Sequence, residues 1–467
     1  MGGRRWGTLE SVGERLTTMR RTPHEHAEHY ELISGWGGQP VRARQVRTSD
    51  LERATRGAVL SRGLGRSYGD SSLPPSNHPV VVNTTLADRL LAFDPDTGLL
   101  HAEAGLTLRE LFEVFLAQGW FSPVSPGTWN VTLGGMVAAD VHGKNHHVAG
   151  CIGEHVTRLT LRVADGRVLE CSREEEPELF RATLGGMGLT GHILEVELQL
   201  ERIPSPWIIA EQLRLRAIDE LIVGLERSAH DWPFTVAWVD CLARGAQLGR
   251  GVLIRGRWAE PEEAPAGVPT PYRRPSVPWT MPDGLMRGPL MRLFNAGFYA
   301  MHRSSPRARI VHPQAFFYPL DAIAHWPRLY GRRGVTQYQC VLPRAARPGA
   351  ARRVLETLSE RGGASFLCVA KDCGAEGTGF LSFPMPGVSL ALDLPIRDDT
   401  PALVAALNER VIEEGGRIYL AKDAFTRREH FTKMEQRLKD WRSVRDRWDP
   451  THSIRSAQSE RLLGNAQ

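Results

Sequence analysis

The chain has 467 residues, of which 42% are apolar and 24% charged, and its formal net charge is +5. This length exceeds what one hydrophobic core usually supports, so we expect two domains. The composition is that of an ordinary globular protein without a low-complexity tract. The small positive charge favours anionic partners only weakly, and no basic run interleaved with aromatics indicates a nucleic-acid groove.

The six cysteines are scattered without Cys-x-x-Cys spacing, which argues against a zinc ribbon, a thioredoxin-type site or a disulfide scaffold. Scattered cysteines of this kind fit a protein that resides in a reducing compartment. Residues 1–30 are charged, lack the apolar core of a signal peptide and are treated as an extension. No run approaches the ~18 apolar residues of a spanning helix. We expect a cytoplasmic protein, with peripheral attachment to the inner membrane and a periplasmic location left open.

From residue 49 to residue 200, short β-rich runs alternate with helices. The run at 80–82 predicts a buried strand, and Thr107 with Glu110 predicts a capping box at the start of a helix with one apolar face. Asp165-Gly166 indicates a hairpin turn. This first block is therefore expected to mix α and β, with antiparallel pairs.

Eight prolines lie between positions 261 and 289, and such a stretch cannot sustain a helix or a central strand. We assign a Pro-rich loop to 258–310, with equal weight for a flap over a site and for a surface insertion without a role. A second sheet is predicted from the strand-like runs at 234–239, 335–342, 365–369 and 388–394. The remainder, 403–463, is expected to be mostly helical.

A glycine loop lies in Ser61-Arg-Gly-Leu-Gly-Arg-Ser-Tyr-Gly-Asp70. Glycines bring backbone N–H groups close to a phosphate. No Gly-Lys-Ser/Thr follows, so this is not a Walker loop, and the third glycine falls one place late for the dinucleotide fingerprint. A second small-residue segment, 126–136, either encloses a pyrophosphate from the other side or packs backbone at a strand crossing. Each segment alone is ambiguous.

The most unusual string is Asp140-Val-His-Gly-Lys-Asn-His-His147. Three histidines invite a metal site, but the paired glutamate of a metalloprotease helix is absent and Gly143 disfavours a helix. We therefore expect no metal and interpret Lys144 and the imidazoles as polar contacts to an anionic cofactor or substrate. An exposed polar loop is the alternative. Lys371 and Lys422 both follow β-like runs, where a lysine can point into a cleft.

Six separated segments, in one order, resemble the flavoprotein family of vanillyl-alcohol oxidase and p-cresol methylhydroxylase. Within it they are most similar to the decaprenylphosphoryl-β-D-ribose 2′-oxidases, the flavin subunits of an epimerase. The segments are 62–70, 142–147, 188–191, 337–339, 383–387 and 421–423. Six matches in one order are specific, and the likeness covers nearly all of the chain after the extension.

The resemblance implies an α+β fold, in which a two-part FAD-binding domain of the vanillyl-alcohol oxidase type carries an inserted antiparallel-sheet substrate domain. The expected boundaries are 31–203 for the first part of the FAD-binding domain, 204–416 for the substrate-binding domain and 417–467 for the C-terminal part of the FAD-binding domain.

FAD is the cofactor that the resemblance implies, and it assigns contacts with FAD to Ser61, Arg62, Gly63, Leu64, Gly65, Arg66, Ser67, Tyr68, Gly69, Asp70, Gly127, Thr132, Leu133, Gly134, Gly135, Ala139, Asp140, His142, Ile193 and Tyr419. In covalent sugar oxidases of this superfamily, a histidine of the glycine loop bonds the flavin. Here Arg66 stands at that place and cannot do so. We therefore expect non-covalent FAD.

Oxidising a secondary alcohol requires the carbinol C–H to face the flavin and a polar group to handle the hydroxyl proton. The resemblance gives the candidates for this catalytic role as Lys422, Tyr68, Gln339 and Lys144. It places in the substrate pocket Trp238, Gln337, Lys371, Ser389 and Ala391. Mycobacterial members have an asparagine and a cysteine at the last two places, so this pocket has no thiol there. Residues 316–319 also depart from the family's pattern, because they are Phe-Phe-Tyr-Pro here and Phe-Tyr-His-Pro in that pattern.

The function that the resemblance implies is oxidation of the 2′-hydroxyl of a polyprenyl-phosphoryl-β-D-ribose to the 2-keto sugar. This is the first half of an epimerisation to the arabinose donor for cell-envelope glycan synthesis. An NADH-dependent short-chain reductase would complete it, and the lipid substrate implies a peripheral membrane surface. The alternative is an aldose or alditol oxidase or dehydrogenase acting on soluble sugars. A third possibility, a catalytically silent lipid-sugar binding protein, is disfavoured by Lys422 and the complete glycine loop.

Overall fold

The computed structural model describes residues 30–270, 274–283, 288–302, 307–346, 348–363 and 367–464. Except for Tyr30, the predicted extension lies outside the described residues, and so do positions 365 and 366 of one predicted strand. Across the described ranges, none of the helices combines the length and apolarity needed to span a bilayer.

Two sheets form the N-terminal part. The first has four strands in the order β1 (Tyr30–Ser34), β2 (Pro40–Arg47), β4 (Val80–Asn83) and β3 (Ser61–Arg62). The second has five antiparallel strands in the order β5 (Leu90–Phe93), β6 (Leu99–Glu103), β10 (His192–Gln199), β8 (Val156–Arg162) and β9 (Val168–Ser172). The strand expected at 80–82 is β4, and the turn at Asp165-Gly166 joins β8 to β9. A two-stranded ribbon joins β7 (Trp120–Phe121) to β11 (Glu201–Arg202).

Helix α3 (Leu108–Phe115) begins as predicted. The Glu110 backbone N–H donates to Thr107 Oγ1 at 3.2 Å, and the Thr107 N–H donates to the Glu110 carboxylate at 2.8 Å. This capping box satisfies two N–H groups that the helix itself leaves unpaired. The helix buries its apolar face in the N-terminal core. The other helices of this part are α2 (Leu51–Ala54), α4 (Leu133–Ala138), α5 (His146–Ala149) and α6 (Pro177–Thr183).

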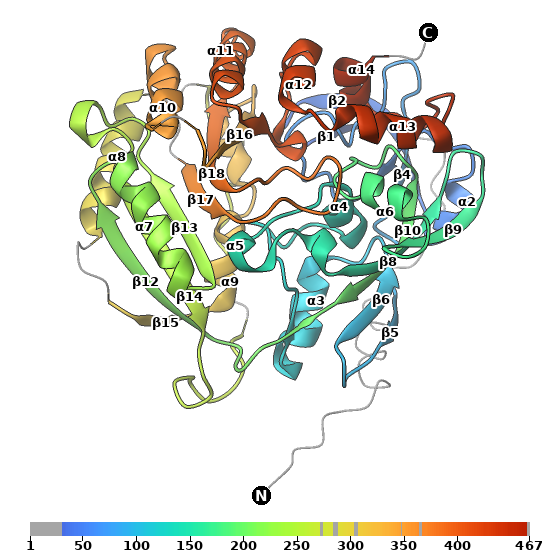
Figure 1. Ribbon diagram of the computed structural model, residues 1–467, viewed down its shortest axis with the longest axis horizontal. Helices are drawn as coiled ribbons and strands as arrows, with labels where there is room; N and C mark the ends of the chain where they lie inside the picture. The colour runs from blue at the N-terminus through green and yellow to red at the C-terminus, as the bar shows by residue number, and fades with distance from the viewer. Residues whose placement is uncertain are drawn as a thin grey trace, which may run out of the picture.

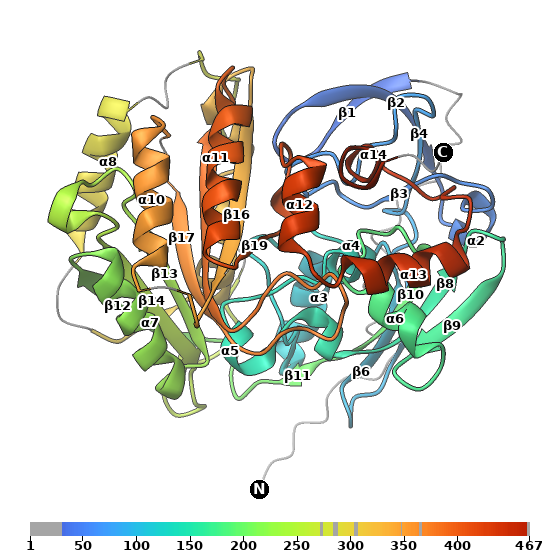
Figure 2. The ribbon, with the colours of Figure 1, turned by 45° about the horizontal axis from the view of Figure 1, so that its top comes forward.

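The second part is built on an eight-stranded antiparallel sheet. Its order is β15 (Arg309–Val311), β12 (Ile208–Leu215), β14 (Gly251–Trp258), β13 (Phe234–Val239), β17 (Cys368–Cys373), β18 (Gly387–Pro395), β16 (Val335–Pro343) and β19 (Arg417–Ile418). Figure 2 shows three helices along one face of it, α7 (Ile218–Asp231), α10 (Ala350–Glu360) and α11 (Thr400–Glu413). The α+β fold with an antiparallel second sheet is confirmed.

Side chains alternate between the two faces of this sheet, because successive residues of a strand point in opposite directions. Ala237, Cys340 and Leu390 belong to the core beneath α7, α10 and α11. Their neighbours Trp238 and Gln339 point to the opposite face. One face is therefore apolar and covered by helices, while the other is free to form a site.

The assignment of 258–310 to a Pro-rich loop was wrong in part. Helix α8 (Gly288–Met301) lies within it, and β15 begins at Arg309. The prolines end at Pro289, in the first turn of α8, where a missing N–H costs no hydrogen bond. After it follow twelve residues without proline, which is enough for three turns. The loop was predicted from the number of prolines in the whole segment, so the start of α8 was not recognised.

After the sheet, the chain returns to the N-terminal part as α12 (Arg428–Met434), α13 (Leu438–Trp448) and α14 (Ala457–Leu463). Figure 1 shows these C-terminal helices, in red, beside the N-terminal strands, in blue. Arg461 of α14 fixes this return, because its guanidinium donates to Asp70 at 2.7 Å and to Asp423 at 2.8 Å. It thereby joins the glycine loop to the segment that carries Lys422.

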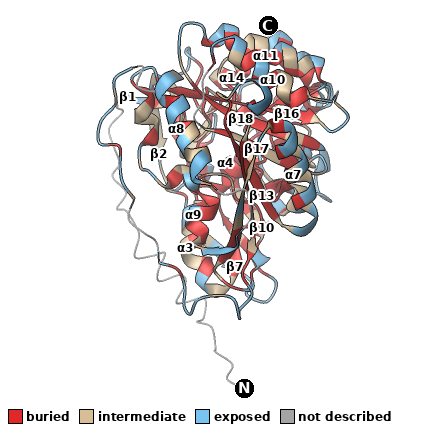
Figure 3. Ribbon diagram, turned by 90° about the vertical axis from the view of Figure 1, so that its left-hand side faces the viewer, coloured by how far each residue is buried: buried red, intermediate tan, exposed pale blue. Residues whose placement is uncertain are grey.

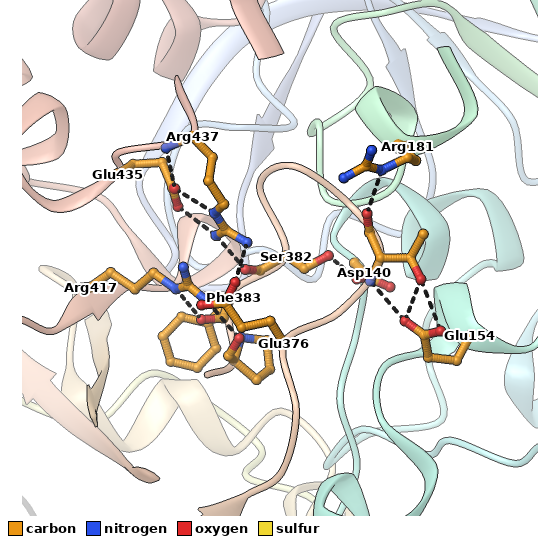
Figure 4. A network of polar contacts seen from close by, with 11 residues as sticks. Asp140, Glu154, Arg181, Glu376, Ser382, Phe383, Arg417, Glu435 and Arg437 are labelled. Atoms are coloured by element: carbon orange, nitrogen blue, oxygen red, sulfur yellow. Dashed lines mark hydrogen bonds and ion pairs between the residues drawn. The ribbon is translucent and has the colours of Figure 1, made fainter. Parts of the chain in front are cut away.

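The loop 374–386, between β17 and β18, ties the two parts together (Figure 4). Its Ser382 hydroxyl donates to Asp140 of the N-terminal part, and Thr378 donates to Glu154 at 2.8 Å. From the C-terminal segments, Arg417 donates to the Phe383 carbonyl at 2.8 Å and Arg437 donates to the Ser382 carbonyl at 2.9 Å. One loop therefore holds segments that are about 300 positions apart in the sequence.

Replacing Arg461 with methionine is expected to lower the free energy of unfolding by about 3 kcal/mol, because two largely buried carboxylates then lose their counter-ion. Urea denaturation followed by tryptophan fluorescence measures the change. Arg447→Met is the matched control, since the pair of Arg447 with Glu178 is exposed on both sides and contributes at most about 1 kcal/mol. Equal losses in the two variants would contradict this role of Arg461.

Candidate active site

A cavity of about 660 Å³ lies between the N-terminal part and the open face of the eight-stranded sheet. The glycine loop, the segment 125–135 and α4 line one side of it. Strands β12, β13, β14, β16, β17 and β18 line the other side, and Tyr419, Ala421 and Lys422 reach it from the C-terminal segment. Residues distant in sequence thus meet in one space.

The side formed by the glycine loop is a cradle without room for side chains. A Cβ on Gly63 would lie 2.3 Å from Thr132 Oγ1, and one on Gly134 would lie 2.9 Å from Ala104 Cβ. Gly65 has a φ of +63°, a conformation that favours glycine. Ser71 Oγ and His142 Nδ1 are buried without a hydrogen-bond partner among the described residues. Close-packed backbone with unsatisfied polar atoms fits a large polar cofactor such as FAD.

Fifteen of the residues predicted to contact FAD line this cavity: Ser61, Arg62, Gly63, Leu64, Gly65, Arg66, Ser67, Gly127, Thr132, Gly134, Gly135, Ala139, His142, Ile193 and Tyr419. The other five lie behind its wall: Tyr68, Gly69, Asp70, Leu133 and Asp140. Contact of these five with FAD stays a prediction.

Each of these five has a local reason for its position. The carboxylate of Asp70 is held by Arg461, and that of Asp140 accepts from Ser382 and from the Gly153 N–H. Leu133 is part of the hydrophobic core. A Cβ on Gly69 would lie 1.9 Å from the Asp423 carbonyl oxygen, so the two backbones touch there. Tyr68, also predicted to be catalytic, is 2% exposed and presents its ring to Lys422 rather than its hydroxyl to the cavity.

All the predicted substrate residues line the cavity, on the open face of four adjacent strands: Trp238, Gln337, Lys371, Ser389 and Ala391. Gln339 joins them, and its amide donates to Ser389 Oγ and to His142 Nε2, both at 3.0 Å. Lys371 lies within β17 and pairs with Ser389, whereas the sequence placed it after a strand. Burial lowers the pKa of His142 well below its usual value, which leaves the ring neutral.

Lysines are rare in this chain and gather at the cavity. Only five of the 58 basic residues are lysines, and three of them line the cavity: Lys144, Lys371 and Lys422. An arginine stays charged when it is buried, whereas a buried lysine can lose its proton near neutral pH. The clustering therefore points to a need for amines that titrate. The scarcity of lysine was not used in the sequence-based prediction, although the number of lysines in the sequence shows it.

Lys422 ends the 3₁₀ turn Leu420–Lys422, and its Nζ lies 4.5 Å from the ring centroid of Tyr68 and 6.0 Å from that of Trp36. Burial lowers its pKa to about 8; nearby Asp393 opposes this shift and Lys371 adds to it. Asp393 is fully buried and accepts from the Gln337 amide. Burial raises its pKa to about 7.

Each of the other two lysines donates to a backbone carbonyl of the opposite part of the fold. Lys144 Nζ donates to the Phe317 carbonyl at 2.9 Å, and Lys371 Nζ donates to the Gly143 carbonyl at 3.2 Å. Burial lowers the pKa of Lys144 to about 7, helped by the charge of Lys371, and lowers that of Lys371 to about 8. Within the described residues, no group of three His, Cys, Asp or Glu side chains is placed to hold a metal ion.

The sequence also failed to predict an apolar wall. It is formed by Val236, Ile254, Phe298, Leu367 and Val369, among others. Two of the strands that build it, β12 and β14, were not predicted. Both are paired on two sides, and their mixed polarity gives a weaker pattern than the alternating runs at β10 or β18. The cavity therefore combines cationic amines with a large apolar surface.

Comparison with known proteins agrees with this site. Residues 46–172 match the family described as FAD binding domain. The chain is 33% identical over 455 residues to "Decaprenylphosphoryl-beta-D-ribose oxidase" of Mycolicibacterium smegmatis, covering 92% of this chain and 97% of that protein. It is also 33% identical over 371 residues to "Uncharacterized protein in mprA 5'region" of Streptomyces coelicolor, covering 76% of this chain and all of that one.

Likeness to sugar-lactone oxidases is confined to a shorter stretch. L-gulonolactone oxidase of Mus musculus is 33% identical over 164 residues, which is 34% of this chain and 36% of that protein. The likeness to the Mycolicibacterium protein, by contrast, runs through both parts of the fold. The chain therefore belongs to the decaprenylphosphoryl-β-D-ribose oxidase family and is an FAD-dependent oxidoreductase.

Proposed function

We propose that the protein oxidises the 2′-hydroxyl of a polyprenyl-phosphoryl-β-D-ribose to the 2-keto sugar, the first half of an epimerisation to an arabinose donor for cell-envelope glycan synthesis. The observation that carries this proposal is the pairing of three buried lysines with an apolar wall in one cavity. Amines suit a phosphate, and the apolar wall suits the start of a lipid chain. A soluble alditol would use neither.

When bound, FAD supplies the two-electron oxidation. Lys422 in its neutral form accepts the proton of the 2′-hydroxyl, and its pKa near 8 suits a base that works close to neutral pH. Lys371 and Lys144, in their charged forms, hold the phosphate. Gln339, fixed by His142 and Ser389, orients the sugar. The apolar wall excludes water from the reacting atoms.

The partner and location that go with this proposal follow from the reaction. A separate NADH-dependent short-chain reductase would reduce the 2-keto sugar on its other face and complete the epimerisation. The protein would work at a membrane surface, since its substrate is a lipid. We propose the cytoplasmic face of the inner membrane as its place. A periplasmic location would place NADH out of reach of that partner.

Anaerobic mixing with farnesylphosphoryl-β-D-ribose in detergent is expected to bleach the visible absorbance of the flavin, whereas free ribose and alditols are expected to leave it unchanged. A stopped-flow spectrum measures both. Ribose 5-phosphate carries a phosphate but no lipid chain, so it separates the contributions of these two groups to binding. Bleaching by alditols alone would replace the proposal with an alditol oxidase, and bleaching by none of these compounds would contradict both.

Non-covalent FAD is expected because Arg66, which lines the cavity beside Trp36, stands where covalent sugar oxidases have the bonding histidine, and a guanidinium does not form that bond. Precipitation with acid should therefore leave the FAD in the supernatant and a colourless pellet. A yellow pellet, with the FAD mass added to the denatured chain, would refute this expectation.

Lys422→Arg is expected to slow flavin reduction by the lipid sugar at least about 100-fold at pH 8, because a guanidinium stays charged and cannot accept the proton. In the wild type, the rate at saturating substrate should rise with pH and level off above about 8, as Lys422 becomes neutral. The variant should lack this rise. Lys433→Arg, an exposed lysine of α12, is the control. A normal pH profile in Lys422→Arg would exclude Lys422 as the base.

A further inference from the structure

Helix α8 presents an apolar face to solvent. Leu290, Leu293, Phe294 and Met301 are 52%, 72%, 53% and 75% exposed. Their spacing of three, four and seven residues places them on one side of the helix, and Gly297 is the only other residue in that arc. In Figure 3, α8 faces the viewer and is coloured largely as exposed. The ordinary preference for polar residues on a solvent-facing side is reversed here.

The opposite side of α8 is anchored to the substrate sheet, so the helix is held in place. Met291 and Asn295 are buried, and the Asn295 amide donates to Asp240 at 2.9 Å. Phe298 packs against Trp238 with 4.6 Å between ring centroids. A helix fixed by one face cannot turn its exposed apolar face inward without breaking these contacts.

This exposed face continues into the cavity. Phe298 and Ile323 line the cavity, and Ile323 is also 40% exposed at the surface. Phe294 of the exposed face stacks on Phe298, with 6.2 Å between the ring centroids. The exposed face of α8 therefore adjoins the apolar wall of the cavity through Phe298.

The same region carries the positive charge of the chain. Between positions 274 and 333 there are nine arginines and two acidic residues, so this segment is strongly cationic while the rest of the chain is slightly anionic. Asp321 is buried and accepts from Thr128 and from the Trp129 N–H. Within this segment, Arg292, Arg307 and Arg309 are exposed. Cations around an exposed apolar patch complement an anionic lipid surface.

We infer that the exposed face of α8, together with Ile323 and the exposed Arg292, Arg307 and Arg309, docks the protein on an anionic lipid bilayer. The patch enters the boundary of the acyl chains while the arginines contact the phosphates of the headgroups. Docked in this way, the cavity opens towards the bilayer. A polyprenyl chain then remains in lipid while its phosphoryl sugar reaches Lys422. This mode of delivery rests on the proposed lipid substrate, but the docking itself does not require it.

Vesicle flotation of the FAD-loaded protein tests the docking without any substrate. We expect binding to vesicles of phosphatidylcholine with one-third phosphatidylglycerol and at least about 10-fold weaker binding to phosphatidylcholine alone. The double variant Leu293→Glu/Phe294→Glu should lose binding to both at least about 10-fold. Leu91→Glu is the matched control, since Leu91 is 38% exposed on β5, on the other part of the molecule, and should bind as the wild type does (Figure 1). An unchanged flavin spectrum verifies that each variant is folded.

Trp279 gives a second readout, because it is 66% exposed in the neighbouring segment. Its fluorescence should shift to the blue with anionic vesicles in the wild type, and Trp279→Phe should remove the shift. Wild-type protein that stays unbound, or a Leu293→Glu/Phe294→Glu variant that floats like the wild type, would overturn the inference. So would a dimer in analytical ultracentrifugation that this variant dissolves without any vesicle binding, because a second copy would then cover the patch. Bleaching by the detergent-solubilised lipid sugar is measured separately, so docking and substrate can fail independently.

Discussion

The burial of three lysine amines in one cavity is the constraint on which the site depends. Each ammonium loses hydration when it is buried, and the structure offsets this with carbonyl acceptors for Lys144 and Lys371 and with Asp393 and two aromatic faces around Lys422. The residual cost appears as lowered pKa values. A phosphate in the cavity would restore the charged forms of the two holding amines, while Lys422 remains the amine that can exchange a proton.

Several distant segments must be held together to create this arrangement. The alternation of side chains along β13, β16, β17 and β18 gives the sheet one apolar face for helices and one face for the cavity. The loop 374–386 and Arg461 then fasten the sheet and the C-terminal segment to the glycine loop. The supporting residues Asp70 and Asp140 serve this fastening. They therefore belong to the site without reaching the cavity.

Local patterns predicted the parts of the fold that depend on neighbours in sequence. The capping box at Thr107, the hairpin at Asp165-Gly166 and the strands β13, β16 and β18 all follow from such patterns. Helix α8 was missed because the prolines just before it led to the prediction of a loop for the whole segment. The strands β12 and β14 were missed because their polarity reflects packing on both sides. Which candidate residues reach the cavity depends on tertiary contacts, so Tyr68 and Asp140 could not be separated from Gln339 by sequence.

The most direct measurement of the central claim is the titration of the cavity lysines by NMR. In a Lys433→Arg/Lys439→Arg variant labelled with ¹³C-lysine, only Lys144, Lys371 and Lys422 contribute Cε signals. Three signals should titrate near pH 7 to 8 in the FAD-loaded protein, well below the ordinary lysine value of 10.5. Titration of all three near 10.5 would contradict the burial of these amines and the role given to Lys422.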